Sequence, residues 1–358
     1  MLKKRIVLLL LVVGLLLIIA ACGSANETNE PAPEAGEEEA SQGGEGETEA
    51  AGNGEQMILR YGELNPDDHP ITEGAYEFSR LVEEATDGRI KIEIFSASAL
   101  GSEREQLQSV QAGGLDFFRP NSSALTDFGA EPMGVLALPF IFENREHQWN
   151  ALNGPAGEEI LQSVEEFIGG MKGLTYYDDG ARHMFTQGSA VESVEDMSGL
   201  KIRVPENAIF MDMISAFNAD PTPINYAELY SALQTGIVDG AENTIAGYLT
   251  NSFYEVAENF SLTSHVASPG VVVVSEMTWN KLSAEDQAII EEAAQQSSEF
   301  VRTQTEKFEE EALAELEELG ATIIQFDDLS SWQAEVSGLY DTYGGDFADL
   351  IETIRATE

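Results

Sequence analysis

Residues 57–118 read MILRYGELNPDDHPITEGAYEFSRLVEEATDGRIKIEIFSASALGSEREQLQSVQAGGLDFF, and this run alternates between the periodicities of strands and helices. In residues 90–94, isoleucine alternates with polar residues, which is typical of a strand with one buried face. Residues 74–87 repeat apolar side chains at helical spacing, and a glycine follows them. A second helical pattern, at 103–112, leads into LDFF at 115–118. This β-α-β-α-β order predicts an α/β sheet with right-handed crossovers.

A second block of the same kind covers residues 182–257, with its clearest strand at 200–204. Four consecutive valines at 271–274 indicate a strand that is buried on both faces. Near the end of the chain, residues 322–324 have the character of a strand, and a helical pattern surrounds Trp332. The α/β pattern therefore continues through the rest of the chain.

A long helical pattern begins at Ser283, which forms a capping box with Asp286, and reaches Leu319 before a glycine. An unbroken helix of this length would span about 50 Å at 1.5 Å per residue. That is longer than one lobe of a protein of this size, so we expect the helix to bridge two lobes. A kink near 295–297 is the alternative.

The N-terminus has the pattern of an export signal. A basic head at residues 3–5 precedes an apolar run at 6–21, and small residues lead to Cys22. This pattern resembles a bacterial lipoprotein signal, which predicts that residues 1–22 end at a lipidated Cys22; an uncleaved membrane anchor is the alternative. Residues 23–56 contain neither an aromatic nor a basic side chain, so we expect an acidic, disordered tether.

Composition excludes several classes of function. The formal net charge is -46, from 64 acidic and 18 basic residues, which argues against nucleic acid as a partner. Cys22 is the only cysteine, so the globular part has no disulfide or thiolate metal site. The four histidines lack metal-ligand spacing, and no nucleophile elbow, phosphate loop or dinucleotide fingerprint is present. We therefore expect no metal, no cofactor and no enzymatic activity.

Arginine is scarce, so an arginine inside an apolar strand requires an explanation. Arg203 lies in the strand LKIRVP, and Arg182 precedes the apolar pair Met184 and Phe185. A buried arginine favours a planar anion, because its guanidinium group can bind a carboxylate through two charge-assisted hydrogen bonds. The carboxylate could belong to a ligand, or to an aspartate or glutamate of the protein itself.

The segment 180–265 closely resembles the substrate-binding proteins of tripartite ATP-independent periplasmic (TRAP) transporters, the DctP-like family. The motifs that carry the resemblance are GAR (180–182), DMSGLKIRVP (196–205), PTP (221–223), ELYSALQTG (228–236) and VDGAEN (238–243). The likeness extends from about residue 57 to about residue 314.

The resemblance implies a carboxylate site. In that family, the arginine that matches Arg203 binds the ligand carboxylate, and the residues that match Arg182 and Asn243 complete the site. Tyr226 matches the aromatic residue that covers the ligand. One departure is Thr244, where the family often has proline.

Substrate identity would depend on the other half of the site. Asn121 occupies a position that varies with substrate in the family. Together with Glu103, Arg119 and His69, it would supply the hydrogen-bonding groups that suit a hydroxylated acid such as a hexuronate. A C4-dicarboxylate would instead use Arg119 as a second carboxylate partner. Arg119 could also form an ion pair within the protein.

The resemblance implies an α/β, two-lobed fold like that of periplasmic binding proteins, with mixed sheets, an interlobe cleft and a long lobe-spanning helix. We expect residues 57–180 and about 266–310 in one lobe, and residues 181–265 and about 311–358 in the other. The implied function is an extracytoplasmic solute receptor, held by lipid at the outer face of the cell membrane. It would deliver a small organic acid to integral membrane subunits of a TRAP transporter. The alternatives are a receptor of an ABC-type importer and a secreted enzyme acting on a carboxylate.

Overall fold

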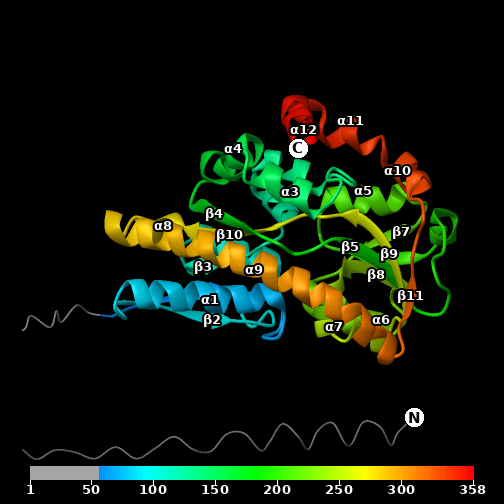
Figure 1. Ribbon diagram of the computed structural model, residues 1–358, viewed down its shortest axis with the longest axis horizontal. Coiled ribbons are helices and arrows are strands. Elements are labelled where there is room, and N and C mark those ends of the chain that lie inside the picture. Colours follow the sequence, from blue (N-terminus) through cyan, green and yellow to red (C-terminus); the bar gives the residue numbers. More distant parts are fainter. Residues whose placement is uncertain (1–55) are drawn as a thin grey trace, which may run out of the picture. The chain divides into compact units, whose positions relative to one another are not determined.

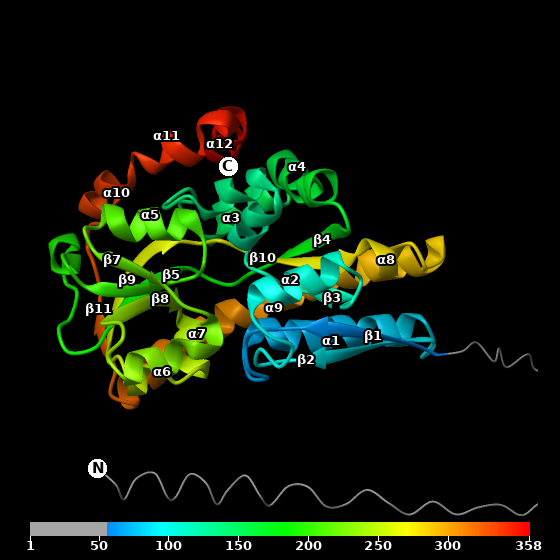
Figure 2. The ribbon, with the colours of Figure 1, turned by 180° about the vertical axis from the view of Figure 1, so that it is seen from behind.

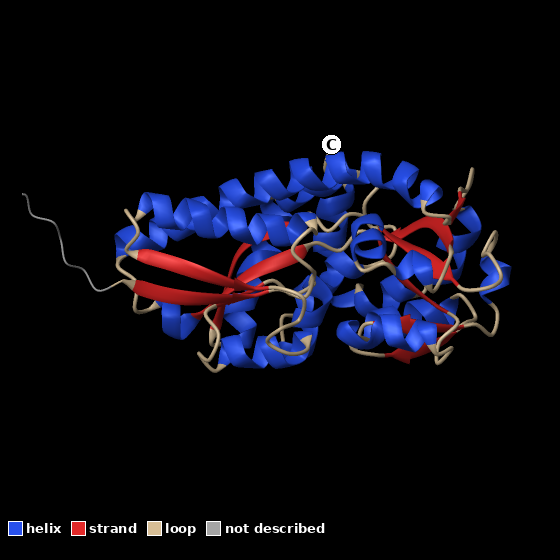
Figure 3. Cartoon of the chain, turned by 90° about the horizontal axis from the view of Figure 1, so that it is seen from below, coloured by secondary structure: helices blue, strands red, loops and turns tan. Residues whose placement is uncertain are grey.

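The computed structural model describes residues 56–358, in which the strands form two mixed sheets with helices on both sides (Figures 1 and 3). The predicted signal, the lipidation site Cys22 and nearly all of the predicted tether lie outside these residues. Within the described range, no helix is both long enough and apolar enough to cross a membrane.

The first sheet has the order β2-β1-β3-β10-β4. Its strands are β1 (Met57–Gly62), β2 (Ile90–Phe95), β3 (Phe117–Phe118), β4 (Met171–Tyr177) and β10 (Gly270–Ser275). Strand β1 is parallel to β2 and β3, whereas β10 is antiparallel to its two neighbours.

The four valines of β10 confirm the prediction of a strand buried on both faces. Val271 and Val273 belong to a core cluster on one side of the sheet, and Val272 and Val274 belong to a cluster on the other. The helices that cover this sheet are α1 (Pro70–Ala85), α2 (Glu103–Gln111), α3 (Arg145–Leu152), α4 (Pro155–Ser163) and α8 (Glu276–Trp279) (Figures 1 and 2).

The second sheet has the order β11-β9-β5-β8-β6-β7. Its strands are β5 (Arg182–Thr186), β6 (Lys201–Val204), β7 (Asp220–Pro223), β8 (Gly240–Thr244), β9 (Asn259–Val266) and β11 (Thr322–Ile324). The surrounding helices are α5 (Ala208–Ala216), α6 (Leu229–Gln234), α7 (Ile245–Thr250), α10 (Ser330–Val336) and α11 (Leu339–Tyr343). Two core clusters fill its two faces, one around Ile202 and Phe210 and the other around Phe185 and Phe260.

Helix α9 (Ala284–Glu318) is a single helix of 35 residues that contacts both lobes (Figures 1 and 2). Its first half packs against α1 and β4, and its second half packs against α7 and β11. Ser283 accepts a hydrogen bond from the Asp286 backbone N–H at 3.1 Å, as the capping box predicts. The lobe-spanning helix is therefore confirmed, without the alternative kink.

The last helix, α12 (Ala348–Arg355), differs from the sequence prediction. Residues 311–358 were assigned to the second lobe, but Leu350, Ile351 and Ile354 join the core cluster of the first lobe. The helix packs against α4, and the Ile354 carbonyl oxygen accepts a hydrogen bond from His147 Nε2 at 2.8 Å. The reason is that one face of α12 is apolar, and the first lobe offers an apolar surface beside α4.

Gly74 allows α1 and α9 to pack closely. A Cβ atom on Gly74 would lie 2.0 Å from Val301 Cγ2 and 3.3 Å from Tyr177 Cε2. We therefore expect Gly74→Ala to reduce the free energy of unfolding by about 1–3 kcal/mol through overpacking.

Urea denaturation of a double-mutant cycle with Val301→Ala tests this prediction. The smaller residue should remove most of the penalty, so the two changes together should cost less than their sum. Gly338→Ala is the control, because a Cβ atom there would meet no neighbour within 4 Å. Strict additivity of Gly74→Ala and Val301→Ala would show that the close contact has no energetic importance.

Candidate ligand site

A cavity lies between the two lobes. Its lining comes from the first lobe, from the second lobe and from the segment that connects β4 to β5. The lining residues are Leu64, Asn65, Glu103, Arg119, Asn121, Asp179, Arg182, Arg203, Pro205, Tyr226 and Asn243. The structure thus brings together seven of the eight predicted ligand residues; His69 is not among those that line the cavity.

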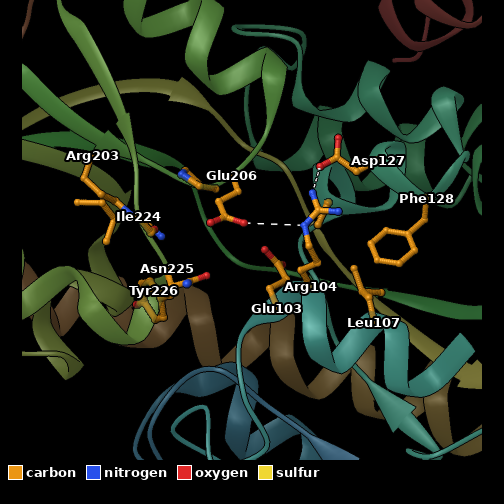
Figure 4. Close-up of a pocket in the computed structure, with 12 residues that line it drawn as sticks. Glu103, Arg104, Leu107, Asp127, Phe128, Arg203, Glu206, Ile224, Asn225 and Tyr226 are labelled. Atoms are coloured by element: carbon orange, nitrogen blue, oxygen red, sulfur yellow. Dashed lines mark hydrogen bonds and ion pairs between the residues drawn. The ribbon is translucent and has the colours of Figure 1, made fainter. Parts of the chain in front are cut away.

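Arg203 is a buried cation without a carboxylate partner in the described part of the chain. It is only 3% exposed, and its Nε donates a hydrogen bond to the Ile224 carbonyl oxygen at 2.8 Å. Burial lowers the pKa of Arg203 to about 10, which still leaves it charged at neutral pH. The Tyr226 ring lies 5.7 Å from the guanidinium carbon (Figure 4). Both Nη groups therefore remain for an anion.

Arg182, by contrast, forms an internal ion pair. Its Nε and Nη2 donate to both carboxylate oxygens of Glu242, which is fully buried, and Nη2 also donates to the Glu242 carbonyl oxygen at 3.0 Å. His265 Nε2 lies 3.5 Å from the same carboxylate. Burial would raise the pKa of Glu242, but Arg182 and His265 outweigh burial and hold that pKa below its ordinary value. The Nη1 group forms no hydrogen bond or ion pair with residues 56–358.

Tyr226 is oriented by two amides. Asn243 Nδ2 donates to its hydroxyl at 3.0 Å, and Asn251 Nδ2 donates at 2.9 Å. Burial raises the pKa of Tyr226 to about 12, so the hydroxyl keeps a proton that it can donate to an acceptor. The departure at Thr244 has a structural role, because its hydroxyl accepts from the Gly247 N–H at 3.1 Å and caps α7.

Arg119 is also paired within the protein. Its Nε donates to Glu63 at 3.0 Å, its Nη2 contacts the other oxygen of the same carboxylate, and its Nη1 lies 3.8 Å from Asp179. Burial lowers the pKa of Arg119, but Glu63 and Asp179 outweigh it, so this pKa lies above its ordinary value. Of the two interpretations left open by the sequence, the geometry favours an ion pair over a free partner for a second carboxylate.

Asn121 and Glu103 are joined to each other. The Asn121 backbone N–H donates to Glu103 at 2.8 Å, while its side chain donates to Ser268 Oγ at 2.9 Å and accepts from the Ser123 N–H at 3.1 Å. Burial raises the pKa of Glu103 more than this hydrogen bond and the nearby arginines lower it. The other oxygen of Glu103 forms no hydrogen bond with residues 56–358.

These features agree with comparisons to known proteins. The DctP family model, described as bacterial extracellular solute-binding protein, family 7, matches residues 61–346. The chain belongs to this family. A solute-binding protein of Chromohalobacter salexigens is 30% identical over 294 residues, covering 80% of this chain and 84% of that protein.

Solved structures of TRAP periplasmic solute-binding proteins share the fold. One from Bradyrhizobium sp. BTAi1, in complex with α/β-D-galacturonate, is 34% identical with a TM-score of 0.80, covering 84% of this chain and all (100%) of that one. Another, from Polaromonas sp. JS666 and bound to D-erythronate, is 34% identical with a TM-score of 0.82, covering 85% and 99%. The predicted family and fold class are thereby confirmed.

The two lobes of this family 7 protein contact each other beside the cavity, next to the lining residues Glu103 and Pro205. Asn207, at the start of α5, donates to the Ser123 carbonyl oxygen at 2.9 Å. Arg104 pairs with Asp127 at 2.6 Å and lies 3.8 Å from Glu206 across the cleft (Figure 4). Arg104 is 45% exposed, so these ion pairs contribute little, and the buried Asn207 bond is the firmer link.

His69 has a structural role that the sequence analysis did not predict. Its Nδ1 accepts a hydrogen bond from the Ile71 N–H at 3.2 Å and caps α1, which begins at Pro70 rather than at residue 74. Burial lowers the pKa of His69 to about 4. The prediction that it contacts the ligand finds no support in this geometry.

We expect His69→Asn to weaken the acid sensitivity of the fold. Asparagine is a good N-cap, so the cap is retained while the buried imidazole is removed. Because the folded pKa lies below the ordinary 6.5, the stability contributed by neutral His69 is complete above pH 6.5 and is lost as the pH falls toward 4. Denaturation at several pH values should show a slope reduced by up to about 1.4 kcal/mol per pH unit in that window. An unchanged slope would contradict the assignment.

Three carboxylates around the site were missed by sequence reasoning: Glu63, Asp179 and Glu242. Glu63 and Glu242 lie 56 and 60 residues from the arginines that they bind, so no local pattern marks them. Asp179 follows Asp178, which accepts from Trp149 Nε1 at 3.1 Å and from the Gly180 N–H at 2.9 Å. The sequence alone does not show that Asp178 has a structural role whereas Asp179 lines the cavity; the fold does.

Proposed function

We propose that this family 7 protein is the solute receptor of a TRAP transporter and binds a small organic acid, with Arg203 holding the ligand carboxylate. The observation that carries the proposal is the charge of Arg203, which is buried in the interlobe cavity while its Nη groups have no partner among residues 56–358. A buried, unpaired cation is costly unless an anion joins it. The galacturonate and erythronate bound by the two similar structures are both carboxylates.

The proposed contacts are strong enough for such a receptor. Each charge-assisted hydrogen bond contributes about 1.5–3 kcal/mol net, so the two Nη groups of Arg203 with help from Tyr226 would support micromolar or tighter binding. Contacts with residues of both lobes favour the closed form, and this population shift would be the signal for the integral membrane subunits. We also propose that the protein releases the acid unchanged, so recovery of intact ligand after incubation is expected.

A thermal-shift screen of uronates, aldonates, dicarboxylates and keto acids tests the proposal, since a ligand of the folded state raises the melting temperature. At least one acid should raise it in proportion to the logarithm of its concentration. The matching neutral sugars should have no effect. Stabilisation by neutral sugars alone would overturn the proposal.

We further propose that lipid on Cys22 and the acidic segment 23–56 hold the receptor at the outer face of the membrane. Such a tether raises the local concentration of the receptor near its membrane partner. Replacement of Cys22 with serine should release the protein into the soluble fraction of cells. A variant that stays with the membrane would contradict the anchor.

A further inference from the structure

Of the three arginines that line the cavity, two already have their charge balanced. Arg119 is bound by Glu63 and Arg182 by Glu242, in each case through both carboxylate oxygens. Both glutamates are fully buried, at 0% exposure, so these two ion pairs are shielded from water. Arg203 is the cation left for a ligand among the described residues that line the cavity.

The part of the cavity formed by the first lobe and the β4–β5 segment is acidic instead. Asp179 is only 9% exposed, lines the cavity, and forms no side-chain hydrogen bond with residues 56–358; its nearest ion-pair contact is Arg119 at 3.8 Å. Glu103 lines the same cavity and has one carboxylate oxygen occupied by Asn121. An ionised carboxylate can only accept hydrogen bonds. These two groups therefore suit hydroxyl donors.

A second ligand carboxylate would meet unfavourable charges here. Three arginines face four carboxylates in and directly behind the cavity wall: Glu63, Glu103, Asp179 and Glu242. Binding one ligand carboxylate at Arg203 leaves no cation to balance another. Like charges a few ångströms apart among buried side chains repel strongly, whereas a hydroxyl in the same place would donate a hydrogen bond to Asp179.

We propose that this site selects polyhydroxylated monocarboxylic acids over dicarboxylic acids, with Asp179 as the residue that determines the choice. The inference rests on the proposed function, because it assumes that Arg203 holds the first carboxylate. It also assigns Arg119 a positioning role: Arg119 holds Asp179 at the cavity wall and does not receive a carboxylate of the ligand.

Two matched pairs of ligands test the selection by isothermal titration calorimetry at pH 7.5. D-galactonate and galactarate differ only at one end of the sugar chain, which is a CH2OH group in the first and a carboxylate in the second, and D-erythronate and meso-tartrate differ in the same way. In each pair that binds, we expect the monocarboxylate to bind about tenfold tighter or more, which corresponds to about 1.4 kcal/mol. A dicarboxylate that binds equally well or better would overturn the inference and leave the proposed function intact. If no organic acid binds in this assay or in the thermal-shift screen, both fail.

The variant Asp179→Asn identifies the responsible charge. The amide keeps the size of the side chain and one acceptor oxygen, so the affinity for the dicarboxylate relative to its monocarboxylate should rise by about tenfold. Asp286→Asn is the matched control, because Asp286 is a similarly buried carboxylate, 8% exposed, that pairs with Arg89 and does not line the cavity. An unchanged ratio in a folded Asp179→Asn protein would refute the role of Asp179.

Discussion

Replacement of Arg203 with alanine should weaken binding of the organic acid by about 10²–10⁴-fold, because two charge-assisted hydrogen bonds of about 1.5–3 kcal/mol each are lost. Arg203→Lys should still cost about tenfold or more. A lysine ammonium is a point charge and cannot reproduce the planar pair of donors. Titration calorimetry with the tightest acid from the thermal-shift screen measures both effects.

Arg203→Ala should not destabilise the unliganded protein. Arg203 is buried with one hydrogen bond to the Ile224 carbonyl oxygen, so removing its charge relieves a desolvation cost. We therefore expect an unchanged or higher melting temperature together with weaker binding. Lys201→Ala is the control, since Lys201 lies on the same strand but is exposed. If Arg203→Lys bound the acid with full affinity, Arg203 would not be the carboxylate partner.

The fold was predictable where local chemistry decides the structure. The alternation of residues 90–94 appears as β2, and the capping box at Ser283 begins α9. The position of α12 was not predictable, because its apolar face could cover either lobe and only the complete tertiary structure shows which surface is free. The early start of α1 was hidden for a related reason, since histidine at position 69 is an uncommon N-cap.

The site shows the same division. Family resemblance and the scarcity of arginine pointed to Arg182 and Arg203, and both line the cavity. Neither observation could say which arginine is free, because that depends on Glu242, which lies on a neighbouring strand of the sheet, directly opposite Met184. Which distant residues form an ion pair depends on which strands are neighbours in the sheet, and no local sequence pattern predicts that order.

The largest effect on stability is expected from Glu63→Gln, which should reduce the free energy of unfolding by about 3–5 kcal/mol. Glu63 is fully buried, accepts from Arg119 and also accepts from the Leu64 N–H at 2.8 Å and the Asn65 N–H at 3.1 Å. Glutamine has the same shape but no charge, so Arg119 would be left as a buried cation with only a distant partner in Asp179. Urea denaturation measures the loss, and Glu77→Gln is the control, because its pair with the half-exposed Arg80 should contribute less than about 1 kcal/mol.

The reason for this loss can be separated from simple packing damage. If the cost comes from the charge stranded on Arg119, then adding Arg119→Met to Glu63→Gln should restore much of the stability, because the double variant no longer buries an uncompensated charge. If the cost comes instead from the lost hydrogen bonds to the Leu64 and Asn65 N–H groups, adding Arg119→Met should lower the free energy of unfolding further. The double variant should also bind the acid less selectively, because Asp179 would lose the cation that holds it at the cavity wall. Recovery of stability without recovery of selectivity would therefore distinguish the role of Arg119 in folding from its role in the site.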